Sequence, residues 1–314
     1  MDIQSITSFL EPVSDELRSI SSHDPNDSFL VNQISFEPDE TAQFTHVMIG
    51  CPQDEGVSRN NGRPGSAKAP NAIRRQLYKL QMPESDHLHL LDAGNVIFQS
   101  LEESHYRLQM AVTHFLKNGC KVVVLGGGND ISFADVSAFT AVFDNCIAIN
   151  MDAHLDMRIQ DVMTSGTPYR KLIEEKKLKP ENLYQFGIRP ESNAPGYLMQ
   201  AAEMGVRIIL RSEVEHAGAL PSFKKITENI DGRPLFLGLD MDSIQMSDAP
   251  GVSAPFPSGF TAREMLDCVE YAAQSNNLKL FEITEMNPDL DIDSGTARLA
   301  ALAVYRFLRP SGRF

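Results

Sequence analysis

The chain has 314 residues, a formal net charge of −14 and an isoelectric point near 5.0. This length suffices for one large domain with a thoroughly buried core. The acidic balance argues against a nucleic-acid or anionic-membrane partner. No apolar stretch is long enough to span a bilayer, and no basic start precedes an apolar segment, so we expect a cytoplasmic protein. Four cysteines without CxxC spacing argue against a zinc–thiolate site.

Strand-like and helix-like segments alternate along the chain. Residues 1–40 mix charged, proline and serine positions, so we expect an outer flap there and a catalytic domain over 41–314. The alternation, without an internal repeat or long linker, predicts a single α/β domain with a mostly parallel sheet flanked by helices. Predicted strands cover 45–51, 88–96, 120–125, 145–151, 182–189, 206–210, 235–239 and 279–284, and predicted helices include 101–118, 219–230, 261–276 and 295–308.

An acidic and imidazole triplet follows the strand predicted at 145–151. Asp152, His154 and Asp156 are spaced two residues apart, so in an extended chain their side chains face one side of the sheet. Two carboxylates and an imidazole crowded together need a cation, and a divalent metal is the obvious one. The alternative is an ordinary turn in which these residues are solvated or cap the next helix.

A second carboxylate pair strengthens the metal interpretation. The apolar strand at 235–239 is followed by Asp240 and Asp242, again two carboxylates on one face. Helix-capping aspartates would give the same local pattern. Open α/β sheets, however, bind ligands beyond the carboxyl ends of their strands. The two strand ends therefore predict a shared metal site.

Two glycine-rich segments follow other predicted strands. The segment from Gly56 to Gly65 is predicted as a loop, and it carries Arg59, Asn60 and Arg63. Because guanidinium groups bind carboxylates through two hydrogen bonds, this loop is a candidate carboxylate clamp, with a solvated basic loop as the alternative. The turn at 126–130 lacks the Gly-Lys-Ser/Thr and GxGxxG motifs of phosphate-binding loops. Its glycines would instead let the backbone pass close to another group in the crevice.

Taken in their order along the chain, the segments from about residue 47 onward resemble the ureohydrolase superfamily of arginase, agmatinase and formimidoylglutamase. Within it, the loop with Arg59, Asn60 and Arg63 and the segment 165–169 are similar to the formimidoylglutamase branch. Enzymes of that branch hydrolyse N-formimidoyl-L-glutamate to L-glutamate and formamide in histidine degradation. The superfamily motifs are Gly126–Asp130, Asp152–Asp156, Asp240–Asp242 and Glu285–Pro288.

The resemblance implies an arginase-like three-layer fold that holds two Mn²⁺ ions per chain. Asp152 and Asp240 would bridge the ions, His154 and Asp242 would complete one, and Asp156 would bind the other. A metal-bridging hydroxide would then attack the formimidoyl carbon, so no dedicated side-chain base is needed.

Further roles also follow from the resemblance. Glu285 would bind the cationic amidine by charge-assisted hydrogen bonds, and Asp156 would carry a proton to the leaving nitrogen. Small-molecule amidino acids are the implied substrates, and homo-oligomers are common among relatives. The residues implied in substrate binding are Arg59, Asn60, Arg63, Ser165, Thr167 and Glu285.

One position departs from the family pattern. Asn129 follows the triple glycine where the family usually has histidine, so we expect either its amide oxygen or Asp130 to bind the first metal ion. Without such a ligand the chain would hold one ion, or be a metal-poor, non-catalytic protein. No histidine lies between His154 and His216, which argues against arginase and agmatinase. A ureohydrolase acting on another guanidino acid, such as guanidinobutyrate, is the remaining alternative.

Overall fold

The structure is a computed structural model that describes residues 3–38, 43–83 and 88–310. Its described strands form one ten-stranded sheet in the order β1-β4-β3-β5-β10-β9-β6-β7-β8, with β2 also pairing to β4. The described pairings are parallel except for β1 with β4. The strands are β1 Leu10–Glu11, β2 Ile34–Ser35, β3 His46–Gly50, β4 Leu90–Val96, β5 Lys121–Leu125, β6 Ile147–Met151, β7 Leu183–Ile188, β8 Arg207–Leu210, β9 Leu235–Asp240 and β10 Leu278–Thr284.

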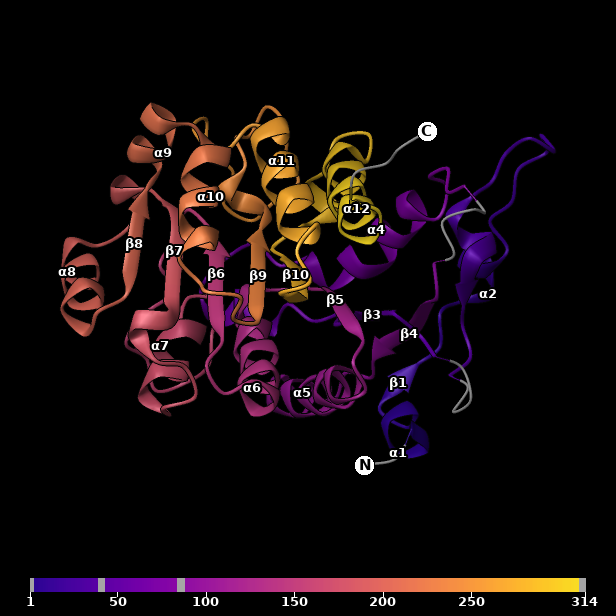
Figure 1. The fold of residues 1–314 in the computed structure, drawn as a ribbon, viewed down its shortest axis with the longest axis horizontal. Coiled ribbons are helices and arrows are strands. Elements are labelled where there is room, and N and C mark those ends of the chain that lie inside the picture. The colour runs from indigo at the N-terminus through magenta and orange to yellow at the C-terminus, as the bar shows by residue number, and fades with distance from the viewer. Residues whose placement is uncertain (1–2, 39–42, 84–87, 311–314) are drawn as a thin grey trace.

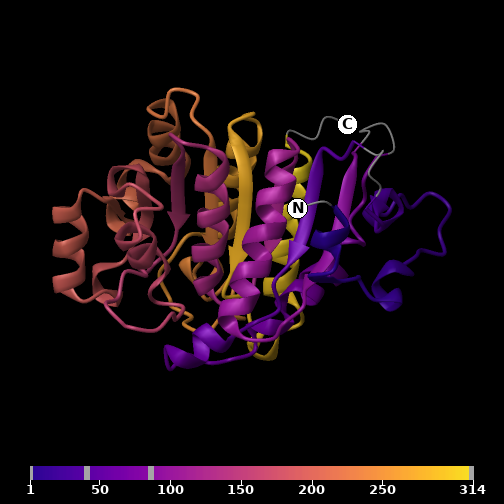
Figure 2. The same ribbon diagram turned by 90° about the horizontal axis from the view of Figure 1, so that it is seen from below.

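Helices cover both faces of the sheet (Figures 1 and 2). One layer contains α4, α10, α11 and α12, and the other contains α5, α6 and α7, with α8 at the β8 end. The predicted single α/β domain is therefore confirmed. The helices are α1 Ile3–Thr7, α2 Asp15–Arg18, α3 Glu55–Arg59, α4 Ala69–Leu77, α5 Leu101–Lys117, α6 Ser132–Val142, α7 Pro168–Glu174, α8 Pro195–Met204, α9 Arg211–Ala217, α10 Ala219–Glu228, α11 Ala262–Ala273 and α12 Gly295–Leu308.

The two helical layers explain why the central strands are apolar along their whole length. Every residue of β6 and β9 is buried, because each face of the sheet packs against helices. Two hydrophobic cores result, one on each face. Among the described residues, no helix combines the length and apolarity needed to cross a membrane.

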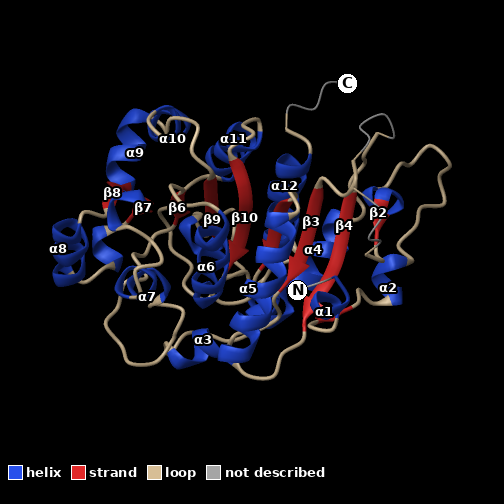
Figure 3. Cartoon of the chain, turned by 60° about the horizontal axis from the view of Figure 1, so that its bottom comes forward, coloured by secondary structure: helices blue, strands red, loops and turns tan. Residues whose placement is uncertain are grey.

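The N-terminal segment joins the same sheet (Figure 3). Its β1 pairs with β4 in antiparallel fashion, and its β2 pairs with β4 in parallel. Apolar side chains of this segment, among them Ile6, Leu17 and Leu30, are buried in the two cores. We expected an outer flap here, whereas the described part of this segment extends the sheet edge.

Some helices differ from the sequence-based expectations, among them α9, for which no helix was predicted. Helix α6 was not predicted, because its residues are buried on several sides and apolar positions therefore show no stripe at helical spacing. The loop predicted over 56–65 begins inside the short helix α3. There Gly56 is required by close approach, since a Cβ atom would lie 1.9 Å from Oδ1 of Asp130.

Candidate active site

The predicted site residues come from loops after four adjacent strands. In the sheet order β5-β10-β9-β6 these strands are neighbours, although their order along the chain is different. All four are parallel, so their carboxyl ends lie at one edge of the sheet. The residues brought to this edge are Asn129 after β5, Asp152, His154 and Asp156 after β6, Asp240 and Asp242 around the end of β9, and Glu285 after β10.

Two overlapping triads of ligand-type groups occupy this edge. One is formed by Asp152, His154 and Asp242, and the other by Asp152, Asp156 and Asp240. Within each triad the candidate ligand atoms all lie within 4.8 Å of one another. Because Asp152 belongs to both triads, the arrangement fits a dinuclear metal site with a shared carboxylate.

The electrostatics of the cluster fit a site that requires cations. Burial raises the pKa of Asp152, Asp156 and Asp240, and neighbouring carboxylates raise these pKa values further. The carboxylate of Asp242 is the main cause that raises the pKa of His154. Oδ1 of Asp242 is buried without a hydrogen-bond partner. A hard divalent cation would satisfy that oxygen and balance the like charges.

A second layer of amides fixes the orientation of the Asp152 carboxylate. Its Oδ1 accepts a 2.7 Å hydrogen bond from the backbone N–H of His154, and its Oδ2 accepts a 3.0 Å bond from Nδ2 of Asn150. Asn150 also donates to Gln185, whose own amide donates to the carbonyl of Leu155. These contacts tie the loop after β6 to β7, so the carboxylate is held in place before a ligand binds.

Asn129 presents its amide nitrogen to the cluster. Nδ2 donates to Oδ2 of Asp156 and lies 3.4 Å from Oδ2 of Asp152. The amide oxygen faces the other way, toward the hydroxyl groups of Ser132 and Thr284. The expectation that this oxygen binds metal stays a prediction, because in this structure it points away from the carboxylates.

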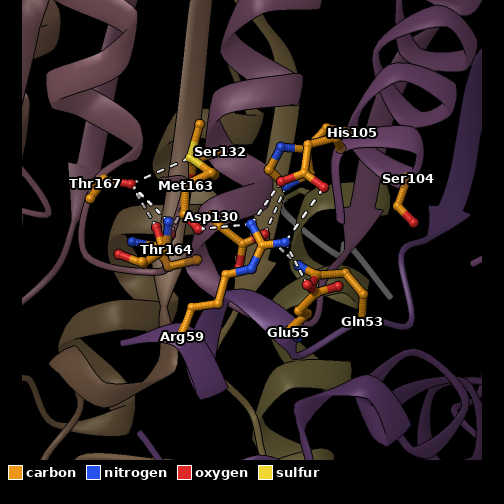
Figure 4. Close-up of polar contacts among 12 residues, drawn as sticks. Gln53, Glu55, Arg59, Ser104, His105, Asp130, Ser132, Met163, Thr164 and Thr167 are labelled. Atoms are coloured by element: carbon orange, nitrogen blue, oxygen red, sulfur yellow. Dashed lines mark hydrogen bonds and ion pairs between the residues drawn. The ribbon is translucent and has the colours of Figure 1, made fainter. Parts of the chain in front are cut away.

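Asp130 does not face the metal-type cluster. Its Oδ2 accepts a 2.6 Å hydrogen bond from Nε2 of Gln53 and makes a 2.7 Å contact with Nε2 of His105 (Figure 4). Asp130 therefore anchors the turn after β5 to α5 and to the segment before α3. The sequence suggested Asp130 as a possible ligand of the first metal ion, and in this structure its carboxylate has these other partners.

Two site residues adopt left-handed backbone conformations that are uncommon for residues other than glycine. The φ angle is +48° at Asp156 and +62° at Glu285. Oε1 of Glu285 accepts a 2.9 Å hydrogen bond from the backbone N–H of Asn129, which links the loops after β10 and β5. Such conformations often occur at functional sites, where surrounding contacts maintain them.

A cavity of about 260 Å³ lies over the cluster. His154, Asp156, Asp240, Asp242 and Glu285 are among the residues that line it. Of the residues predicted to bind substrate, Asn60, Ser165 and Glu285 also line the cavity. Nδ2 of Asn60 donates a 3.1 Å hydrogen bond to Oγ of Ser165, which joins the two loops.

The predicted guanidinium clamp is not assembled in the structure. Arg59 forms ion pairs with Glu55 and Glu102, as Figure 4 shows for Glu55. Arg63 donates from Nε and Nη2 to the backbone carbonyls of Ser253 and Val252. Neither arginine is among the described residues that line the cavity.

Thr167, also predicted to bind substrate, is turned inward. It is fully buried, and its hydroxyl group donates a 2.9 Å hydrogen bond to the carbonyl of Thr164 (Figure 4). Thr167 therefore shapes the loop that carries Ser165.

Arg158 is a cavity residue that the sequence analysis missed. It is exposed, lines the cavity, and has no hydrogen bond or ion pair to its guanidinium group within the described part of the chain. The spacing of Asp152, His154 and Asp156 continues to residue 158, and this signal could have identified it. Asn193 and Tyr197, from the loop after β7 and from α8, line the same cavity and carried no motif.

Comparisons with known proteins agree with this geometry. The family model described as Arginase family matches residues 44–309. The chain is 33% identical to the formimidoylglutamase of Citrobacter koseri over 261 residues, which cover 81% of this chain and 82% of that protein.

Solved structures show the same similarity. The formiminoglutamase of Trypanosoma cruzi, solved with Mn²⁺₂, has a TM-score of 0.84 and 31% identity, covering 90% of this chain and 98% of that one. An asparagine-to-histidine variant of that enzyme was also solved with Mn²⁺₂. The formimidoylglutamase of Bacillus subtilis has a TM-score of 0.84 and 28% identity, covering 92% of this chain and 94% of that one. The chain belongs to the arginase family, within its formimidoylglutamase branch.

Proposed function

We propose that this protein is a manganese-dependent formimidoylglutamase that hydrolyses N-formimidoyl-L-glutamate to L-glutamate and formamide. The observation that carries the proposal is a cavity lined both by members of the two overlapping triads and by Arg158, whose guanidinium group has no partner among the described residues. A substrate with a cationic amidine at one end and carboxylates at the other matches this distribution of charge.

Two Mn²⁺ ions fit the donor set. Asp152 would be shared between them, His154 and Asp242 would hold one, and Asp156 and Asp240 would hold the other, as the two triads suggest. Carboxylates with one imidazole are ligands that suit Mn²⁺. When bound, the ions supply a water-derived nucleophile at neutral pH and polarise the amidine.

Glu285 is the proposed amidine-binding residue. Its carboxylate is buried, lines the cavity and is oriented by the backbone N–H of Asn129. A buried carboxylate binds an amidinium through charge-assisted hydrogen bonds. Glu285 would therefore hold the formimidoyl carbon beside the metal-type cluster.

The other end of the substrate needs donors for two carboxylates. Arg158 offers a guanidinium fork, and the side chains of Asn60 and Ser165 lie in the same cavity wall. Arg59 and Arg63 would support this wall indirectly, because both hold loops in place in the structure.

Asp156 remains the proposed proton carrier. Water adds to the formimidoyl carbon, the bond from that carbon to the glutamate nitrogen breaks, and the leaving nitrogen takes up a proton. The carboxyl group of Asp156 lines the cavity and belongs to one triad, so it lies where such a proton is needed.

The test is a substrate panel with Mn²⁺-loaded protein. Formamide release from N-formimidoyl-L-glutamate, with much slower release of urea from guanidinobutyrate, is the expected result. An Asp240→Asn variant serves as the matched inactive control. Urea from guanidinobutyrate at the higher rate would instead support the guanidino-acid alternative, and no product from either substrate in a protein that binds manganese would overturn the proposal.

A further inference from the structure

The side chain of Asn193 is bonded to three backbone groups of two loops. Its Nδ2 donates 2.8 Å hydrogen bonds to the carbonyls of Ala153 and Arg189, and its Oδ1 accepts a 2.9 Å bond from the backbone N–H of Leu155. Both amide hydrogens are therefore used. Turning the amide over would place its oxygen against two carbonyls and its N–H groups against an N–H group, so these partners fix its orientation.

Two of these contacts lie on either side of His154. The carbonyl of Ala153 belongs to the peptide group before His154, and the N–H of Leu155 belongs to the peptide group after it. Peptide groups are planar, so the orientations of these two planes set the φ and ψ angles of the residue between them. Asn193 therefore holds the backbone of His154 and, with it, the direction in which the imidazole leaves the chain.

Other contacts hold the same loop, but they act on one side of His154. The backbone N–H of Arg189 donates a 3.0 Å bond to the peptide group before it. Nε2 of Gln185 donates a 2.8 Å bond to the carbonyl of Leu155, one peptide group further along the chain. Among the described residues, Asn193 has the one side chain that bonds to the peptide groups on both sides of His154.

The loop after β7 presents Asn193 in a defined backbone conformation. The segment η6 Pro190–Ser192 forms a turn of 3₁₀ helix, and Asn193 follows it with φ of −128° and ψ of 135°. The backbone N–H of Asn193 donates a 3.2 Å bond to the carbonyl of Pro190. Pro190 and Pro195, on the two sides of Asn193, restrict the backbone further. The loop therefore supplies a rigid support from which the amide reaches the loop after β6.

We propose that Asn193 is a positioning residue that fixes the backbone of His154 for metal binding. Asn193 lines the cavity, but it donates nothing to a substrate carboxylate, because both of its amide hydrogens already have acceptors. The inference rests on the metal site of the proposed function. Loss of the Asn193 amide should weaken the ion held by the triad of Asp152, His154 and Asp242 without removing a ligand.

A Mn²⁺ titration of Asn193→Ala tests this inference. The variant keeps every candidate ligand but releases the two peptide groups beside His154, so one ion should bind about tenfold more weakly, the lower end of the effect of losing an outer-shell contact. Isothermal titration and metal analysis after desalting give the affinity and the stoichiometry. Asn193→Gln keeps the amide group but changes its reach, and it should show the same loss. Asn229→Ala, at an exposed asparagine whose Nδ2 donates to the carbonyl of Lys225, should behave like wild type.

A double-mutant cycle separates positioning from a structural role. In a His154→Ala background there is no imidazole to orient, so Asn193→Ala should leave Mn²⁺ affinity within about twofold. A merely structural role would lower the melting temperature in chelator and leave the affinity of the folded protein unchanged. Asn193→Gln gives a second measurement if Asn193→Ala does not fold.

Steady-state kinetics gives a further readout. With Mn²⁺ at a concentration that saturates each protein, KM of Asn193→Ala should stay within about twofold of the wild-type value, since Asn193 does not bind the substrate. A KM raised tenfold or more with unchanged Mn²⁺ affinity would assign Asn193 to substrate binding and overturn the inference.

Two metal-binding results would also overturn it. One is unchanged Mn²⁺ affinity in folded Asn193→Ala, and the other is an equal loss of affinity in the His154→Ala background. Failure of the proposed function gives a different pattern. Wild-type protein that binds two ions but releases no formamide would refute the substrate and leave the role of Asn193 intact.

Discussion

Nδ1 of His154 lies 3.3 Å from Oδ2 of Asp242, although the two residues follow different strands, β6 and β9. The Asp242 carboxylate raises the pKa of His154, which favours the protonated imidazole when no cation is bound. A divalent cation that binds both side chains must displace that proton. Metal binding, stability and protonation are therefore linked at this contact.

Manganese should stabilise the folded protein. Binding at a concentration of 100 times Kd adds about 2.7 kcal/mol per site to the free energy of unfolding, and it removes repulsion among buried carboxylates. Thermal denaturation with chelator and with Mn²⁺ measures the effect. The Asp240→Asn variant, which alters one triad, should show a smaller increase in melting temperature. Equal increases in both proteins would contradict the predicted ligand set.

Stability should depend on pH through Glu282. Burial raises the folded-state pKa of this acid from 4.5 to about 7, and burial together with the charge of Glu282 also raises the pKa of its buried neighbour Asp135. The contribution of protonated Glu282 to the free energy of unfolding is thus fully present below about pH 4.5. It is lost as the pH rises through about 7, at up to ~1.4 kcal/mol per pH unit. Denaturant unfolding between pH 4.5 and 8 at saturating Mn²⁺ should show a shallower dependence in Glu282→Gln. The exposed-site variant Glu175→Gln should keep the wild-type dependence.

Arg158 should matter for substrate binding, and Arg59 should not. Loss of a charged hydrogen bond to a substrate carboxylate costs about 1.5–3 kcal/mol, so Arg158→Ala should raise KM about ten- to a hundredfold with little change in kcat. Arg59→Ala removes only partly exposed ion pairs and should keep KM within about twofold. Steady-state kinetics on both variants decides the matter. If Arg59→Ala raised KM and Arg158→Ala did not, the carboxylate clamp predicted from the sequence would be supported instead.

Glu285→Gln should reduce kcat/KM by about a hundredfold or more. The variant keeps the side-chain shape and the acceptor for the Asn129 N–H, but it removes the charge that binds the amidinium. Metal stoichiometry should remain that of wild type, because Glu285 belongs to neither triad. Loss of bound manganese together with activity would show that Glu285 supports the metal site and does not bind substrate.

Much of the site was predictable because its signals are local. The alternation of Asp152, His154 and Asp156 at the end of an apolar strand fixes their common direction, since successive side chains of a strand point to opposite faces. Apolar runs likewise predicted the central strands. Helix α6 was missed because a helix buried on several sides has no apolar stripe. Arg158 was missed although it continues the two-residue spacing of Asp152, His154 and Asp156, because the prediction considered only metal-binding side chains at these positions.

By itself the amino-acid sequence determined which residues could bind metal and which strand each one follows. Only the tertiary structure decided that β5, β10, β9 and β6 are neighbours, which brings residues far apart in the chain to one edge. It also decided the direction of the Asn129 amide and turned Arg59 toward Glu55 and Glu102. The physical reason is that strand order and side-chain partners depend on long-range packing and hydrogen bonding, which no local spacing encodes.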